Sequence, residues 1–174
     1  NEKYLKNVLE LHNHKQSADH KKPEAYFNYL LALKAERKGD IDEAVDRYRM
    51  VLAHDPDTEV LYNKLVYLYL SNGQLDQAIT VCRNGLNRFP KNSKLLLALA
   101  EVLTARGENE EALSYLNQVS INPHTIKALL LSGLIQIQNQ YYSQAEQTLT
   151  QLVHVDPGNP LGYHLLGRNY VLTQ

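Results

Sequence analysis

The sequence has 174 residues and contains one cysteine, one methionine and no tryptophan. The single thiol, Cys82, cannot form a disulfide within the chain, and no second cysteine is present to share a zinc ion with it. Cys82 lies on the apolar stripe of a helical pattern, so we predict a buried, unreactive thiol. The methionine is Met50, so the printed sequence does not begin at a start codon.

Long apolar runs and excess charge are also missing. No run of about 18 apolar residues occurs, which is the length that a membrane-spanning helix needs, and the N-terminal region lacks the apolar core of a secretion signal. Lys and Arg number 18 against 19 Asp and Glu, so no long-range field attracts nucleic acid or an anionic membrane. We expect no nucleic-acid partner and no direct membrane span. The compartment stays open between the cytoplasm and a bacterial cell envelope.

The residues that are present repeat along the chain. Glycines and alanines recur at intervals of 34 residues: Gly39, Gly73 and Gly107, and Ala44, Ala78 and Ala112. Each interval contains two helical patterns joined by a short turn. The next interval, from Ala112 to Ala145, has 33 residues, and the spacing then recovers. Self-similarity at this period predicts a chain of two-helix units.

This pattern resembles the tetratricopeptide repeat family from residue 25 to residue 174. The second unit carries the family's marks most fully, with Tyr62, Leu65, Tyr69, Gly73, Ala78 and Pro90. The first unit has Asn28 where a large apolar residue is usual, and the fourth has Gln140 where the turn glycine is expected. The resemblance implies an all-α fold, a right-handed α-solenoid of four repeats plus the first helix of a fifth.

The apolar spacing and the turn residues predict where the helices lie. The expected ranges are 24–38 and 41–54, 58–71 and 75–88, 92–106 and 109–120, 125–139 and 142–155, and 160–172. They group into units of about 25–58, 59–92, 93–125 and 126–159, with a partial unit at 160–174. In the fourth unit we predict that Asn139 takes the left-handed turn conformation that glycine takes elsewhere.

Residues 1–22 do not follow the repeat and are predicted to form a helix and a linker. Tyr4, Leu5, Val8, Leu9 and Leu11 have the spacing of an amphipathic helix at about residues 2–12. We expect this helix to cover the exposed end of the first repeat. The alternative is that it ends a longer upstream region. The half repeat at the other end likewise suggests a segment of a longer chain.

Small residues recur where two helix backbones are expected to come close together. These are Ala32, Ala100, Gly133 and Gly167 in first helices, and Ala44, Ala78, Ala112 and Ala145 in second helices.

No constellation of catalytic, cofactor-binding or metal-ligating residues is recognisable. His12 and His14 are two residues apart, so they point to different sides of a helix. Glu108, Glu110 and Glu111 begin a predicted helix, where carboxylates interact favourably with the helix dipole. No glycine-rich phosphate loop or nucleophile elbow is present. We predict that the segment is not an enzyme and holds no cofactor or metal.

The resemblance implies that the first helices line a concave groove in which peptides or partner helices bind. The groove positions are Tyr26, Tyr29 and Leu33, then Val60, Asn63, Tyr67 and Leu70, then Lys94, Leu97 and Glu101, then Lys127, Leu130 and Leu134, and finally Leu161, His164 and Arg168. Their apolar, tyrosine-rich composition is typical of a binding surface. The alternatives are that several of them belong to the core or that the N-terminal helix fills the groove. Some members of the family bind chaperone tails with a clamp of polar and cationic residues. That clamp is disfavoured here, because Tyr29, Leu33 and Leu97 occupy positions where it needs such residues.

We therefore predict a scaffold or adaptor that binds a partner peptide or amphipathic helix. The degenerate repeats favour a bacterial assembly or envelope protein. One alternative is a targeting or regulatory region of a larger multidomain enzyme. Another is a scaffold that self-associates into a homo-oligomer through its ends.

Overall fold

The computed structural model of the chain describes residues 22–119 and 124–174. These residues form nine α-helices and no strand, which confirms the all-α prediction. Within the same ranges, no helix is both long and apolar enough to cross a membrane. The predicted helix at residues 2–12 lies outside the described residues. The chain divides at Pro56 into two compact units, which we describe separately.

The first unit is a helix pair, α2 (Lys22–Lys38) and α3 (Ile41–His54). The side chain of Asp40 caps α3 by accepting a hydrogen bond from the backbone N–H of Glu43. Tyr48 is fully buried between the helices, and its ring meets that of Tyr29 edge-on with the centroids 5.7 Å apart. Its hydroxyl donates to Glu36 over 3.0 Å, so the polar end of this core tyrosine is satisfied.

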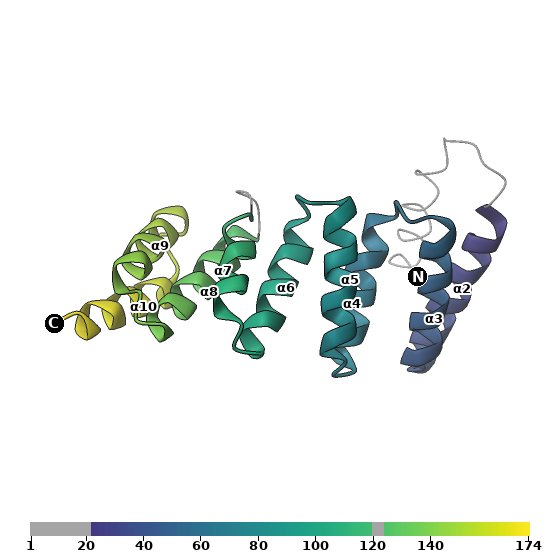
Figure 1. Cartoon of the computed structure of the whole chain (residues 1–174), viewed down its shortest axis with the longest axis horizontal. Coiled ribbons are helices and arrows are strands. Elements are labelled where there is room, and N and C mark those ends of the chain that lie inside the picture. The colour runs from purple at the N-terminus through teal and green to yellow at the C-terminus, as the bar shows by residue number, and fades with distance from the viewer. Residues whose placement is uncertain (1–21, 120–123) are drawn as a thin grey trace. The chain divides into compact units, whose positions relative to one another are not determined.

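The second unit contains the other seven helices of the described ranges, and Figure 1 shows them following one another in chain order. They are α4 (Glu59–Ser71), α5 (Leu75–Arg88), α6 (Ser93–Ala105), α7 (Asn109–Leu116), α8 (Thr125–Gln138), α9 (Tyr142–Val155) and α10 (Pro160–Leu172). The repeat pattern therefore produces the helix-on-helix stack of an α-solenoid. Consecutive helices from α4 to α10 pack against one another.

The helix boundaries agree with the predicted ranges to within two residues, except at the end of α7. The predicted range reached residue 120, whereas α7 ends at Leu116. The N–H groups of Gln118 and Val119 bond to carbonyls three residues earlier. This is the tighter hydrogen bonding of a turn, so the α-helical pattern has already ended.

The two kinds of helix in the second unit are spaced differently. The first helices of successive repeats contact one another, α4 with α6, α6 with α8 and α8 with α10. In the described part of this unit, no such contact joins α5 to α7 or α7 to α9. The first helices are therefore closer together than the second helices. The stack curves with α4, α6, α8 and α10 on its inner side.

Four turns within repeats share one hydrogen-bond pattern. In the second repeat, the N–H of Gly73 bonds to the carbonyl of Leu70, and the next N–H bonds to the carbonyl of Tyr69. This Schellman pattern requires positive φ at the residue after the C-cap. That residue is glycine in the first three repeats. In the fourth it is Gln140, with φ of 63°, so the prediction of Asn139 was wrong. Asn139 is the C-cap and has φ of −86°.

Most of the predicted small residues lie where helices pack tightly. All six of the predicted alanines are fully buried, with 0% exposure. A Cβ atom added to Gly133 would lie 2.5 Å from Leu149 Cδ2. Gly167 does not follow the prediction, because it is exposed and a Cβ there would meet nothing within 4 Å. No helix of the described residues packs on that side of α10.

Candidate functional site

Twelve of the thirteen predicted groove residues of the second unit, all except Leu70, occupy equivalent repeat positions, which form three rows across α4, α6, α8 and α10. We call these twelve residues the inner face. The rows are Val60, Lys94, Lys127 and Leu161; Asn63, Leu97, Leu130 and His164; and Tyr67, Glu101, Leu134 and Arg168. Because the first helices contact one another, neighbouring members of a row lie on adjacent helices. These residues therefore make up one candidate surface.

The inner face exposes large apolar side chains between charged ones. Tyr67 is 66% exposed, Val60 is 52% exposed and Leu161 is 49% exposed. Leu130 and Leu134 are half-buried, because they also pack against the core cluster of α8, α9 and α10. Exposed apolar side chains gathered in this way usually mark a binding surface.

The remaining predicted positions of this unit divide by exposure. The charged residues and the histidine are exposed: Lys94, Glu101, Lys127, His164 and Arg168. Asn63 and Leu70 are half-buried. Leu97 is only 6% exposed, so it belongs mainly to the core and offers little surface to a ligand.

The three predicted positions of the first unit are described apart from the inner face. Tyr26 is 36% exposed on α2. Tyr29 is buried against Tyr48, and Leu33 is only 9% exposed. These two side chains serve the packing of α2 on α3. The alternative that some groove positions are core residues therefore describes Tyr29, Leu33 and Leu97.

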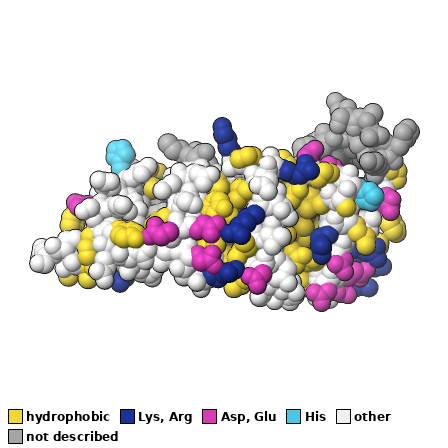
Figure 2. All heavy atoms as spheres, in the orientation of Figure 1, with side chains coloured by type: hydrophobic (Ala, Val, Ile, Leu, Met, Phe, Trp, Pro, Cys, Tyr) yellow, Lys and Arg dark blue, Asp and Glu magenta, His cyan; other side chains and the backbone are white. Residues whose placement is uncertain are grey.

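Charges on the outer side of the second unit are paired. Arg83 Nη2 lies 2.8 Å from Glu111 Oε1, and this pair joins α5 to α7. Arg106 Nη1 lies 2.8 Å from Asp76 Oδ1. The Tyr141 hydroxyl, at the start of α9, donates to Glu110 of α7 over 2.6 Å. Figure 2 shows basic and acidic side chains lying next to one another over the middle of this unit. Long side chains thus bridge the wider gaps between the second helices.

The cations of the inner face are not paired in this way. Lys94, Lys127 and Arg168 form no ion pair with any residue that the structure describes. Glu101 is the single acid among the twelve inner-face residues. The inner face therefore has an excess of positive charge, although the whole chain has a net charge of −1.

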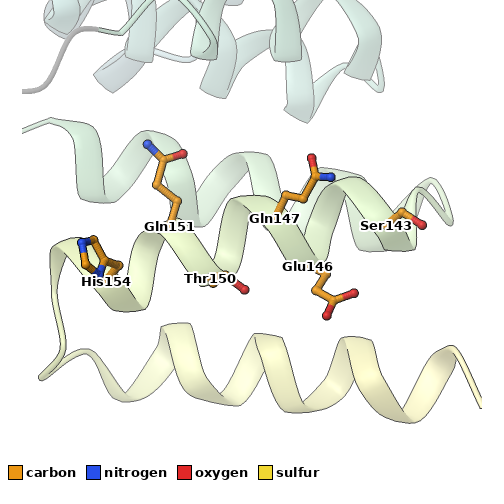
Figure 3. A pocket seen from close by; sticks show the side chains of 6 residues that line it. All are labelled: Ser143, Glu146, Gln147, Thr150, Gln151 and His154. Carbon is orange, nitrogen blue, oxygen red and sulfur yellow. The ribbon is translucent and has the colours of Figure 1, made fainter.

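A polar hollow lies on the exposed side of α9. Its lining residues are Ser143, Glu146, Gln147, Thr150, Gln151 and His154. Figure 3 shows that all six come from this one helix, with Glu146 pointing toward α10 and Gln147 and Gln151 pointing away from it. A single helix cannot enclose a ligand from opposite sides, so the hollow is a weaker candidate than the inner face.

The titratable groups in the core are held in their neutral forms. Cys82 has no exposed surface, and burial raises the pKa of its thiol to about 12. The prediction of a buried thiol is confirmed. Burial, assisted by Glu36, also raises the pKa of the Tyr48 hydroxyl. In residues 22–119 and 124–174, no group of three or more His, Cys, Asp or Glu side chains is placed to hold a metal ion. His12 and His14 lie outside these ranges.

A model of the tetratricopeptide repeat family matches residues 35–91, 69–122 and 103–168. The chain belongs to this family. The fold of the family generally mediates protein–protein interaction, and the predicted resemblance is confirmed.

Individual relatives agree with this assignment. The chain is 26% identical over 141 residues to the photosystem I assembly protein Ycf3 of Synechococcus sp. (strain WH7803), covering 79% of this chain and 70% of the relative. It superposes on the crystal structure of MamA protein with a TM-score of 0.74, at 21% identity, covering 84% of this chain and 81% of that one. A tetratricopeptide repeat protein from Parabacteroides merdae ATCC 43184 also gives a TM-score of 0.74, at 25% identity, covering 84% and 60%.

The sequence interpretation missed several features that the register could have located. Val171 lies three residues beyond Arg168 and is 75% exposed, so it extends the apolar surface along α10. Gly85 faces Tyr62 and Leu95 so closely that an added Cβ would lie 2.6 Å from Leu95 Cδ1. The outer pairs were detectable too, because their partners are 28 to 31 residues apart, close to one repeat.

Proposed function

We propose that this chain is a scaffold or adaptor that holds a partner polypeptide, either an extended peptide or an amphipathic helix, on the inner face of its second unit. The observation that carries the proposal is the exposure of Tyr67 and Val60, both more than half exposed, on α4. Burying such side chains against a partner stabilises the complex by roughly 25 cal/mol for each Å² of apolar surface removed from water. Tyrosine adds a hydroxyl that can hydrogen-bond a peptide backbone.

Two further observations support an adaptor. Arg83 and Arg106 on the outer side are paired with acids of the chain, whereas the inner-face cations form no ion pair with the described residues. The cyanobacterial relative is named an assembly protein, which agrees with a chain that holds other proteins. Members of the family are generally scaffolds without catalytic activity, and we extend that property to this chain.

Selection of binders from a random peptide library displayed on phage tests the proposal. The full chain is the bait, and fluorescence polarisation measures the affinity of the selected peptides. We expect the double variant Val60→Ala, Tyr67→Ala to bind them at least tenfold more weakly, because two exposed apolar contacts are removed. The matched control, Met50→Ala with Val155→Ala, removes two exposed apolar side chains from second helices and should bind normally. Circular dichroism confirms that both variants are folded.

Loss of binding in both double variants, or in neither, would count against the inner face. Failure to select any peptide would count against peptide binding altogether.

A second proposal, self-association, rests on α10. Tyr170, Val171 and Leu172 are 46%, 75% and 45% exposed, and a second copy of the chain could bury them. Light scattering over a range of concentrations tests this idea. A mass that rises with concentration in the parent, and not in Val171→Ser with Leu172→Ser, would support it. A constant monomeric mass would remove it.

A further inference from the structure

We infer that the partner segment carries acidic residues between large apolar ones and crosses the first helices of the second unit along the row Val60, Lys94, Lys127 and Leu161. This inference rests on the proposed function, because it specifies the chemistry of the polypeptide that the inner face binds. It follows from the order of side chains along the row and from the way charge is divided between the two sides of the unit.

The row presents an apolar residue, two cations and another apolar residue in succession. Its four members occupy equivalent positions of α4, α6, α8 and α10, and these helices contact one another in that order. Helices in contact are about 8–10 Å apart, which is the length of about three extended residues at roughly 3.3 Å each. A complementary peptide therefore has a large apolar residue, an acid three residues later, a second acid three residues after that, and a final apolar residue. The pattern reads the same in either chain direction.

Folding does not account for the two lysines. Lys94 and Lys127 lie in the first turns of α6 and α8, where the helix dipole favours acids rather than cations. Helices α3, α4, α5 and α7 do have acids in their first turns. The two lysines are exposed and form no ion pair with the described residues. Carboxylates of a partner would supply the missing counter-charges.

Arg168 adds a third unpaired cation on α10, while Glu101 sits among them on α6. A continuous phosphate backbone would be repelled by Glu101 and would leave the apolar residues without partners. A polypeptide can place carboxylates opposite the lysines and leucine or aromatic side chains opposite Val60 and Leu161. The observations therefore favour an acidic, apolar polypeptide over a nucleic acid.

Peptides selected on the full chain from the random library provide the probes. We expect them to be enriched in acids flanked by large apolar residues at the spacing above. The variant Lys94→Gln with Lys127→Gln should bind them at least about fivefold more weakly, and the affinity of the parent should fall as salt rises. The control, Gln144→Glu with Gln151→Glu, makes the same change in net charge at exposed positions of α9 and should bind normally.

The outcomes separate the inference from the proposed function. Peptides that lose binding in Val60→Ala with Tyr67→Ala, but not in the lysine variant, would overturn the acidic partner and leave the inner face as the binding surface. Peptides that are not enriched in acids would do the same. Equal weakening by the lysine variant and its charge-matched control would show a general effect of net charge and overturn the inference. If the peptides bind both the Val60→Ala, Tyr67→Ala variant and the lysine variant as tightly as the parent, the proposed function and the inference are both overturned.

Discussion

Gly133 of α8 and Leu149 of α9 touch so closely that a Cβ atom added to the glycine would lie 2.5 Å from Leu149 Cδ2 and 2.8 Å from its Cγ. Leu149 is fully buried among Ile137, Leu152 and Leu165. A methyl group added at Gly133 would therefore require Leu149 or the two helices to shift.

We predict that Gly133→Ala lowers the free energy of unfolding by about 1–3 kcal/mol, because overpacking outweighs the gain in helix propensity. Gly167 is the matched control, since it lies at the equivalent position of α10 in open space. Gly167→Ala should raise the free energy of unfolding by up to about 1 kcal/mol. Denaturant titrations measure both changes. Equal effects of the two substitutions on the free energy of unfolding would show that the Leu149 side chain moves aside at little cost.

A second prediction concerns the turn between α8 and α9. Gln140 has a φ of 63°, which costs a non-glycine residue roughly 1–2 kcal/mol. Gln140→Gly should therefore raise the free energy of unfolding by about 1 kcal/mol, after allowance for the flexibility of glycine in the unfolded chain. Asn139→Gly is the control and should lower it, because Asn139 has negative φ and accepts a hydrogen bond from Asn109 over 2.9 Å. Thermal unfolding compares the two variants. If Asn139→Gly stabilised the chain, the assignment of Gln140 as the left-handed residue of the turn would be contradicted.

A third prediction follows from a polar residue in an apolar repeat position. Leu68, Val102 and Ile135 precede Asn169 at one-repeat intervals, and all four are buried. The Asn169 amide donates to the Tyr142 carbonyl over 3.0 Å, whereas its Oδ1 atom finds no partner among the described residues.

Asn169→Leu keeps the branched shape and removes the unpaired oxygen, so it should raise the free energy of unfolding by about 1 kcal/mol. Asn169→Asp should lower it, because an unpaired charge would be buried. The denaturation midpoints of the parent and the two variants measure both changes. A less stable leucine variant would show that the bond to Tyr142 matters more than the unpaired oxygen.

A fourth prediction concerns the reactivity of Cys82. Burial raises the pKa of its thiol from the ordinary 9.0 to about 12, and only the thiolate reacts with a disulfide reagent. At neutral pH the thiolate is therefore much scarcer in the folded chain than in the unfolded chain. Ellman's reagent should label the thiol rapidly in denaturant and very slowly in buffer. Fast labelling of the native chain would contradict the burial.

The same pKa predicts a pH dependence of stability. Because the folded pKa lies above 9.0, the folded state holds the proton more tightly than the unfolded state. The stabilisation is fully present below about pH 9 and is lost as pH rises toward the folded pKa. The free energy of unfolding of Cys82→Ala should fall less steeply over this range than that of the parent. Parallel slopes would show that Cys82 stays protonated in both states.

The fifth prediction tests the outer side of the second unit. Arg83 and Glu111 join helices that make no backbone contact, and both side chains are more than one-third exposed. A double-mutant cycle with Arg83→Met and Glu111→Gln should give a coupling of at most about 0.5 kcal/mol, and high salt should remove it. A coupling energy above about 2 kcal/mol between Arg83 and Glu111 would mean that the outer ion pairs stabilise the curvature of the helix stack.

The sequence by itself determined the order of the helices, their boundaries except at the end of α7, and the repeat register. It could do so because helix boundaries depend on local signals: apolar spacing, acids at helix starts, and glycine in the turns. The same register places Val60, Lys94 and Lys127 in one row. The family followed from the spacing of Gly39, Gly73 and Gly107.

Tertiary structure alone decided how much of each predicted side chain is exposed. Periodicity places Tyr29 and Tyr67 on similar faces of their helices, yet Tyr29 is 6% exposed and Tyr67 is 66% exposed. The difference depends on how closely neighbouring residues approach, and periodicity within one helix does not specify this approach. Gly167 is exposed for a related reason, since no described helix packs on its side of α10. The left-handed residue is Gln140 because the hydrogen bonds that end α8 require positive φ at that position, whatever its side chain.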